Sequence, residues 1–348
     1  MSGGVGGTLS GRQICEGVTL FVGHALSVIP SIPRASVQTI VTSPPYLDAR
    51  DYGLSPSPWP EVVYRPRYDL PEVTAPADRA CLGSERTLIG YVAHLVLVAR
   101  ALRWALRPDG TLWLNLAAGY SAGTTSRRKP TTTQGPDVPS SWRSRCESAR
   151  ITVGLPAKQR IPAVSAVCDA LQADGWWVRN RVVWHKPNAK PDSARDRCSP
   201  AHEELLLLTP GPRYYFDGDA ISTLAKYPRS HNRARRYGEG RDDPGDHHGD
   251  SIPWEGKRAK PRDVWTIPVK GYRGAHSATF PADLARRCIL AGSRPGDLVL
   301  DPFAGSGTVG EVARSLGRSA VLVEASERYV EECLGPRVLG SNEGRKRR

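Results

Sequence analysis

Two short apolar strands, one near each end of the chain, run into loops that constrain the fold more than any other feature. Near the C-terminus, residues 298–300 (LVL) lead into residues 301–308, which read DPFAGSGT. Near the N-terminus, residues 37–41 (VQTIV) lead into residues 42–46, which read TSPPY. A strand that ends in a glycine-rich loop and continues into a helix is a common ligand-binding unit of α/β proteins. The two loops therefore predict a sheet whose binding edge combines opposite ends of the chain.

Strands and helices are expected to alternate along most of the chain. After the glycine loop, a helix at 309–316 and a strand at 320–323 complete a βαβ unit. Such alternation predicts an α/β fold with a doubly wound, mostly parallel sheet that is covered by helices on both faces. The remaining expected strands are residues 19–22, 111–116, 176–184 and 204–208, and the remaining expected helices are residues 25–29, 89–106, 161–174 and 282–291.

Several segments lack apolar periodicity and are expected to form no regular structure. Residues 48–86 are rich in proline and predict a long loop, and residues 107–110 (RPDG) predict a turn. Residues 121–150 are rich in Ser, Thr, Pro and Arg and predict a flexible basic loop. Residues 226–262 hold many charged residues and few apolar ones, which makes them the weakest folding segment.

The charge of the chain favours a polyanionic partner. The formal net charge is +13 over 348 residues, and a basic surplus of that size suits nucleic acid. No stretch approaches 18 uninterrupted apolar residues, so no membrane span is expected. Residues 1–11 are rich in Gly and Ser without an apolar core, so no signal peptide is expected.

The cysteines and histidines predict neither a disulfide framework nor a metal site. Seven cysteines are scattered without a CxxC pair, which is typical of reduced thiols and predicts a cytoplasmic protein. His247 and His248 stand among aspartates but lack spaced partners, so a solvated loop is favoured over metal ligation.

The glycine loop formally matches the dinucleotide-binding pattern GxGxxG, with Glu324 closing the next strand. Two observations argue against a nicotinamide-dependent oxidoreductase. The loop begins at Gly305 of 348 residues, which leaves too little chain for the second half of such a fold. Asp301 also ends the strand, where it would repel a pyrophosphate but attract a ligand ammonium group. S-adenosylmethionine, which has an ammonium group, a ribose diol and no phosphate, fits better, with Glu324 accepting the ribose hydroxyls.

The second loop suits chemistry on an exocyclic amine. Pro44 and Pro45 have a fixed φ and no N–H, so they form a rigid turn without neighbouring donors. An exocyclic base nitrogen becomes nucleophilic when acceptors bind its hydrogens, and the Ser43 hydroxyl and Pro44 carbonyl are the expected acceptors. Tyr46 offers a ring that would stack on a base flipped out of the duplex. None of the cysteines is required as a nucleophile.

Together, in this order and spacing, the two motifs resemble the β-group amino DNA methyltransferases, the N-4/N-6 DNA methylase family that depends on S-adenosylmethionine. The resemblance covers most of the chain, including residues 106–115, 184–188 (WHKPN), 195–197 (RDR), 202–203 and 276–281. It implies double-stranded DNA as the partner, with a cognate restriction endonuclease as a possible second partner. It also implies methylation of cytosine N4 in preference to adenine N6, because adenine members more often carry an acid where Ser43 stands.

The resemblance assigns a role to each candidate site residue. The expected catalytic residues are Ser43, Pro44, Pro45 and Tyr46. The expected cofactor-binding residues are Asp301, Pro302, Phe303, Ala304, Gly305, Ser306, Gly307, Thr308, Glu324, Phe280 and His24. The expected DNA-binding residues are Arg195, Arg197, Arg233, Arg235, Arg236, Lys257 and Arg258, and no metal is expected.

Two departures from the family pattern keep a second hypothesis open. His24 stands where relatives usually carry an aspartate, and Ala118 stands where an acid is common. These changes would also suit a catalytically weakened DNA-binding relative. The expected division is a catalytic half at 1–219, a target-recognition segment at 220–268, a cofactor-binding half at 269–340 and a basic tail at 341–348.

Overall fold

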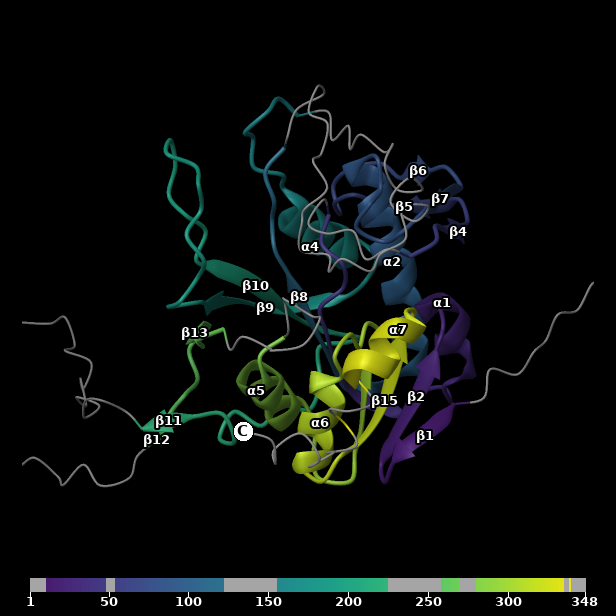
Figure 1. Ribbon diagram of the computed structural model, residues 1–348, viewed down its shortest axis with the longest axis vertical. Helices are drawn as coiled ribbons and strands as arrows, with labels where there is room; N and C mark the ends of the chain where they lie inside the picture. The colour runs from purple at the N-terminus through teal and green to yellow at the C-terminus, as the bar shows by residue number, and fades with distance from the viewer. Residues whose placement is uncertain are drawn as a thin grey trace, which may run out of the picture.

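A nine-stranded sheet in the order β1-β2-β15-β14-β3-β8-β10-β9-β13 forms the centre of the molecule (Figure 1). Five neighbouring pairs are parallel, whereas β1–β2, β8–β10 and β10–β9 are antiparallel. The predicted α/β fold with a mostly parallel sheet is therefore confirmed. The computed structural model describes residues 11–47, 54–121, 155–224, 258–269, 280–334 and 338.

Most of the strands fall where the sequence predicted them. The edge strands β1 and β13 are additions, because each is too short to show an apolar period. The strands of the sheet are β1 (Arg12–Cys15), β2 (Val18–Val22), β3 (Val37–Thr42), β8 (Leu106–Leu116), β9 (Trp177–His185), β10 (His202–Thr209), β13 (Val264–Thr266), β14 (Leu298–Asp301) and β15 (Ser319–Glu324).

Helices cover both faces of the sheet, and consecutive strand residues divide between two apolar clusters. Ile40 and Leu300 face the first cluster, while Val41 and Val299 face the second, as the pleat of a strand requires. The first cluster contains α1 (Ala25–Val28), the 3₁₀ helix η1 (Ile29–Ser31), α2 (Leu88–Ala105) and α4 (Ala163–Ala173). The second contains α5 (Ala282–Gly292) and α6 (Thr308–Ser315), which lie side by side in Figure 1. The chain continues into α7 (Glu327–Tyr329) and the π-helix η2 (Val330–Leu334).

Within the part of the chain that the structure describes, α2 is the one helix long and apolar enough to cross a membrane. Its Thr87 N-cap accepts a hydrogen bond from the Gly90 N–H, which fixes the start of the helix. More than half of α2 is buried, and it packs against α4, η1 and the sheet. These contacts make α2 a core helix of the domain.

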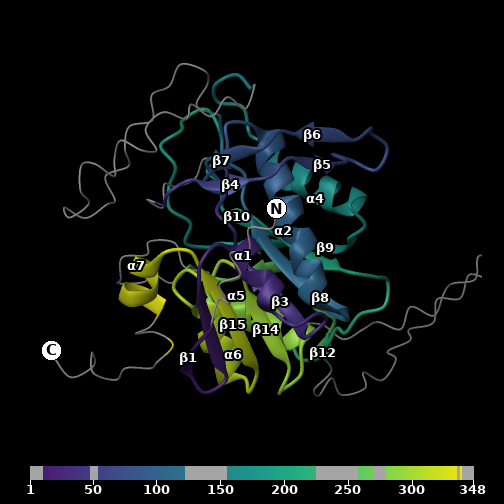
Figure 2. The same cartoon turned by 90° about the vertical axis from the view of Figure 1, so that its right-hand side faces the viewer.

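The structure corrects the prediction of one long loop at 48–86. Within this segment β4 (Ser57–Trp59) pairs with β7 (Asp78–Ala80), and β5 (Val62–Tyr64) pairs with β6 (Val73–Ala75). Each strand has only three residues, which is too short for a period-2 pattern to stand out among the prolines. Trp59 and Tyr64 nevertheless turn inward and are buried, and the four strands lie together beside α2 (Figure 2).

The predicted turn at 107–110 is also wrong, because β8 runs without a break from Leu106. Val37 pairs with Leu106 and Thr39 pairs with Thr111, so four residues of β8 stand opposite Gln38 alone. The pairing of the two strands is therefore irregular at these four residues. Gln38 donates from Nε2 to the Asp109 carbonyl at 3.3 Å. A Pro and a Gly at a bulge are compatible with a strand. Two further short strands, β11 (Thr223–Leu224) and β12 (Arg258–Ala259), form a small sheet of their own.

Candidate functional site

The two loops singled out in the sequence meet in space at the carboxyl ends of β3 and β14. Thr42, the last residue of β3, donates from Oγ1 to Oδ1 of Asp301, the last residue of β14, at 2.7 Å. These residues are 259 positions apart in sequence. Because β3 and β14 are parallel neighbours, their C-terminal residues lie at the same edge of the sheet. The next residue after Thr42 is Ser43, so the Ser-Pro-Pro-Tyr turn that the sequence predicts to be catalytic begins beside the Asp301 carboxylate.

Asp301 is a buried carboxylate with one oxygen already occupied. The Phe303 N–H donates to the same Oδ1 atom at 3.1 Å, and Asp301 is only 4% exposed. Within the described part of the chain, both donors reach Oδ1 and none reaches Oδ2. Burial, with a smaller contribution from the nearby Glu324 charge, raises the pKa of Asp301 to about 7, although the hydrogen bonds from Thr42 and Phe303 oppose the shift. A buried carboxylate without a counter-charge is costly, so the site favours a cationic ligand group.

Glu324, at the end of β15, organises the glycine loop. Its Oε2 accepts the Gly305 N–H at 2.8 Å and its Oε1 accepts the Ser326 N–H at 2.9 Å. Burial raises its pKa, although these backbone hydrogen bonds oppose the shift. Gly307 has a left-handed φ of 76° and precedes α6, and an added Cβ there would lie 2.9 Å from a Val338 methyl carbon. The carboxylate therefore fixes the loop while its remaining lone pairs stay able to accept from a ligand.

The other expected cofactor residues surround these two carboxylates. Ala304 donates its N–H to the Val323 carbonyl at 2.9 Å, and the Ser306 and Thr308 hydroxyls lie 3.4 Å apart. Phe280 precedes α5 and is half-buried against the second apolar cluster. Pro302 is buried and Phe303 is half-buried, so the loop is a packed part of the domain.

His24 follows β2 and is the N-cap residue of α1. Its Nδ1 accepts the Leu26 N–H at 3.3 Å at the start of α1, and the adjacent Gly23 N–H donates to the Glu324 carbonyl at 2.9 Å. Burial and the neighbouring His94 lower the pKa of His24, which favours the neutral ring. His24 thus caps α1 with a ring whose neutral form is favoured.

The catalytic turn is tied into a hydrogen-bonded network at its Tyr46 hydroxyl. Ser43 Oγ and Tyr46 Oη lie 2.8 Å apart, and Tyr46 Oη donates to Glu203 Oε2 at 2.7 Å. Asn115 Nδ2, from the end of β8, donates to both Tyr46 Oη and Glu203 Oε2 at 2.6 Å. Lys186 forms an ion pair with Oε1 of Glu203. Glu203 and Lys186 reach this edge because β10 runs antiparallel to β8, so its first residues lie beside the last residues of β8 and β9.

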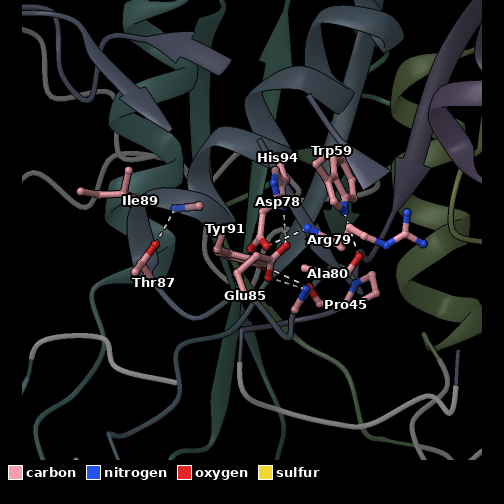
Figure 3. A network of polar contacts seen from close by, with 12 residues as sticks. Pro45, Trp59, Asp78, Arg79, Ala80, Glu85, Thr87, Ile89, Tyr91 and His94 are labelled. Carbon is pink, nitrogen blue, oxygen red and sulfur yellow. Dashed lines mark hydrogen bonds and ion pairs between the residues drawn. The ribbon is translucent and has the colours of Figure 1, made fainter. Parts of the chain in front are cut away.

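Side chains from α2 and from the loop that precedes it hold the Ser-Pro-Pro-Tyr turn in place (Figure 3). Tyr91 Oη donates to the Pro45 carbonyl at 3.0 Å. Glu85 is buried, and it accepts the Gly83 N–H at 2.8 Å and contacts His94 Nδ1 at 2.9 Å. Gly83 has a φ of 88°, and an added Cβ there would lie 2.8 Å from the Tyr46 carbonyl oxygen. Only glycine therefore fits against the turn at this position.

Trp59 connects this support to the cofactor side of the site. Its ring stacks on His94 at a centroid distance of 4.0 Å, and His24 meets it edge-on at 4.9 Å. Its Nε1 donates to the Ala80 carbonyl at 3.0 Å, which holds β4 against β7 (Figure 3). The short strands β4 and β7, which were not predicted from the sequence, thus hold the Trp59 ring between His94 and His24.

Few of the expected DNA-binding residues lie in the described part of the chain. Arg195 is exposed, where it can meet a phosphate. Arg197 donates to Asp192 Oδ2 at 2.6 Å and lies over the Tyr120 ring at 3.6 Å, so it also holds its own loop together. Arg258 begins β12, and nothing of its side chain is described. Arg233, Arg235, Arg236, Lys257, His247 and His248 lie outside the described residues.

Sequence reasoning missed Asn115, Glu203, Lys186, Glu85 and Tyr91 as parts of the site. Three of them had a signal, since Asn115, Lys186 and Glu203 lie in the segments 106–115, 184–188 and 202–203 that the resemblance covers, without a role assigned to any of the three. The described residues contain no group of three or more metal-ligating side chains. The side chains of five cysteines are described, and all five are free thiols.

Comparison with known proteins places the chain in the family that the two sequence motifs resemble. A family model described as DNA methylase, N6_N4_Mtase, matches residues 37–334. The type II methyltransferase M.Cfr9I of Citrobacter freundii is 35% identical over 91% of this chain and 86% of its own length. M.SmaI of Serratia marcescens is 34% identical over 89% of this chain and 87% of its own length. The chain therefore belongs to the N6_N4_Mtase family of DNA methylases.

Solved structures show the same fold at lower sequence identity. A PvuII DNA methyltransferase (cytosine-N4-specific) aligns with a TM-score of 0.55 and 16% identity, covering 94% of each chain. TTHA0409, a putative DNA modification methylase from Thermus thermophilus in complex with S-adenosyl-L-methionine, aligns with a TM-score of 0.51 and 22% identity, covering 92% of each chain. These likenesses confirm the fold that was predicted from the two motifs.

Proposed function

We propose that this DNA methyltransferase transfers a methyl group from S-adenosylmethionine to the exocyclic N4 of cytosine in double-stranded DNA. The observation that carries the proposal is the hydrogen bond between Thr42 and Asp301, because it joins the two loops. It sets the acceptor Ser43 directly beside a buried carboxylate suited to the cofactor ammonium. An amine activated at Ser43 and a methyl donor bound at Asp301 would therefore occupy neighbouring positions.

The cofactor-binding residues are proposed from the charges and backbone of the three parallel strand ends. Asp301 would accept from the methionine ammonium with its Oδ2, and Glu324 would accept from the ribose hydroxyls with its remaining lone pairs. His24 would border the adenine side as a neutral ring. S-adenosylmethionine, the methyl donor of this class, supplies a methyl group on a positively charged sulfur.

The target base is proposed to bind against the Ser-Pro-Pro-Tyr turn. Tyr91 holds the Pro45 carbonyl, so the Pro44 carbonyl is the acceptor expected to face the amine beside Ser43 Oγ. The Tyr46 ring would stack on the flipped base while its hydroxyl stays fixed by Glu203. Ser43 is uncharged, and the resemblance implies cytosine because adenine members more often carry an acid at this position. Adenine N6 is the alternative target, since the same two acceptors would serve either amine.

The product identifies the target base directly. Unmethylated plasmid DNA incubated with the protein and labelled S-adenosylmethionine would be digested to nucleosides and analysed by mass spectrometry. N4-methylcytosine is the expected product. N6-methyladenine would overturn the proposed base and leave the methyltransferase intact, and single-molecule sequencing of DNA from expressing cells would give the sequence context. We place the protein in the cytoplasm with its DNA substrate.

DNA affinity is expected to fall steeply with salt concentration, because the net charge of +13 implies phosphate neutralisation and counterion release. Neutralising Arg233, Arg235 and Arg236 together should flatten the log–log slope by up to about three units if each contacts one phosphate. Fluorescence anisotropy across a salt series measures the slope.

The matched control for the salt series neutralises three exposed arginines at the end of the sheet opposite the candidate site. They are Arg34, Arg213 and Arg294. This control variant should keep the wild-type slope. An unchanged slope in the Arg233, Arg235 and Arg236 variant would show that the 220–268 segment does not face DNA. Residues 127–150 would then be the better candidates for the recognition surface.

A further inference from the structure

The hydrogen bonds that lead away from Ser43 have a fixed direction. The Asn115 amide nitrogen can only donate, and an ionised Glu203 carboxylate can only accept. The single Tyr46 hydroxyl proton therefore points to Glu203, at 2.7 Å. Tyr46 Oη must then accept from Ser43 across their 2.8 Å contact, so the Ser43 proton points to Tyr46. The Ser43 lone pairs are left directed away from this chain of hydrogen bonds, where they can accept a proton from an amine.

Glu203, at the far end of these hydrogen bonds, is a partly buried carboxylate in a fixed position. Glu203 is 14% exposed and Lys186 18% exposed, and the two form an ion pair. The Lys186 ammonium also lies 4.4 Å from the centroid of the buried Trp184 ring, which restricts its position. Asn115 donates a second hydrogen bond to the carboxylate. Lys186 and Asn115 thus fix the position of the carboxylate, and Glu203 Oε2 lies two hydroxyl groups away from the proposed target amine, where a proton passed along the hydrogen bonds can reach it.

We propose that Glu203 is the final acceptor of the proton that the target amine loses, which it receives through Ser43 and Tyr46. This inference rests on the proposed function of the Ser43 turn. Glu203 acts through two other residues and is therefore a positioning residue for proton transfer.

Each step of the transfer conserves atoms and charge. The nitrogen lone pair forms the new N–C bond, and the electron pair of the broken C–S bond stays on sulfur. The amine proton passes to Ser43 Oγ while the Ser43 proton passes to Tyr46 Oη and the Tyr46 proton passes to Glu203 Oε2. Ser43 and Tyr46 end neutral, and Glu203 ends as a carboxylic acid. The positive charge that arrived on the sulfonium is thus carried away as a proton, which Glu203 later releases to solvent.

The test measures single-turnover methylation of plasmid DNA by the full-length protein. Glu203→Gln keeps the shape of the side chain but removes the acceptor, and a rate about 100-fold lower is expected. Tyr46→Phe interrupts the same chain and should slow the step comparably, with the double variant little slower than either alone. The control is Glu204→Gln, an adjacent carboxylate that pairs with Arg181 instead and should leave the rate near wild type.

Rescue separates proton transfer from a merely structural role. Glu203→Ala leaves space for a small carboxylate, so added formate should restore part of its rate, whereas Glu203→Gln should not respond. A wild-type rate in Glu203→Gln, or no formate response in Glu203→Ala with folding and cofactor affinity intact, would overturn the proposal. If Glu203→Gln fails to fold, Tyr46→Phe provides the decisive rate. The nucleoside product of the wild type tests the target base separately, because either amine must lose a proton.

Discussion

Ser43→Ala is expected to lower the single-turnover methylation rate by about 100- to 1,000-fold, the usual loss when one preorganised polar partner of a reacting group is removed. The structure gives the reason. In the proposed mechanism, Ser43 Oγ connects the target amine to Tyr46 Oη, which lies 2.8 Å away. Its removal takes away an acceptor for the amine and breaks the path to Glu203 in one change.

Cofactor affinity should stay near wild type in Ser43→Ala, because Thr42 rather than Ser43 bonds to Asp301. The measurements are rapid-quench methylation with enzyme in excess over DNA and calorimetry with S-adenosylmethionine. Ser36→Ala, at the other end of β3, is the matched control, since the Ser36 hydroxyl donates to the nearby Pro33 carbonyl, away from the site. A Ser43→Ala variant that methylated DNA at the normal rate would mean that another residue accepts from the amine.

The backbone of this site could be predicted because its parts carry local signals. Asp301 follows a strand of three apolar residues, and Ser43 follows another strand, so parallel pairing alone brings both to one edge. Gly305 and Gly307 indicate from the sequence alone that this loop adopts left-handed backbone conformations, and both residues have a positive φ. These features depend on residues that are adjacent in the chain.

The support of the site could not be predicted because it depends on contacts between distant segments. Tyr46 and Glu203 are 157 positions apart, and Asn115 joins them from a third strand. A carboxylate at the start of an ordinary strand gives no sign that an antiparallel neighbour will place it at the binding edge. The pairing of Glu85 with His94 could not be predicted for the same reason. In the sequence the two look like surface residues, and only the packing of the helix shows that they form a buried pair.

The predicted loop at 48–86 failed for a related reason. Its strands are only three residues long, and the inward residues Trp59 and Val62 are separated by Pro60 and Glu61, which hides the apolar period. What fixes Trp59 is its stacking on His94 and its edge contact with His24. Pairing of such short strands is determined by tertiary contacts rather than by local propensity.

Asp301→Ala is expected to weaken S-adenosylmethionine binding by about 10- to 150-fold, which corresponds to roughly 1.5–3 kcal/mol for a lost charged hydrogen bond. Asp301→Asn should lose a similar amount, because it keeps the shape and removes the charge. Asp297→Ala, which lies at the opposite end of β14 and accepts the Arg294 N–H, is the matched control and should bind normally. Calorimetry that showed wild-type affinity in Asp301→Ala would remove the carboxylate from the cofactor site.

The wild-type affinity should also depend on pH in a way that Asp301→Asn abolishes. Burial raises the pKa of Asp301 to about 7, so without ligand the carboxyl is largely protonated below that pH. A ligand ammonium favours the ionised form, and binding at pH 6 must therefore release close to one proton. Affinity should rise up to about tenfold per pH unit below 7 and level off above it. Titrations in buffers with different ionisation enthalpies measure the released proton, and a wild type that releases none would place the ammonium away from Asp301.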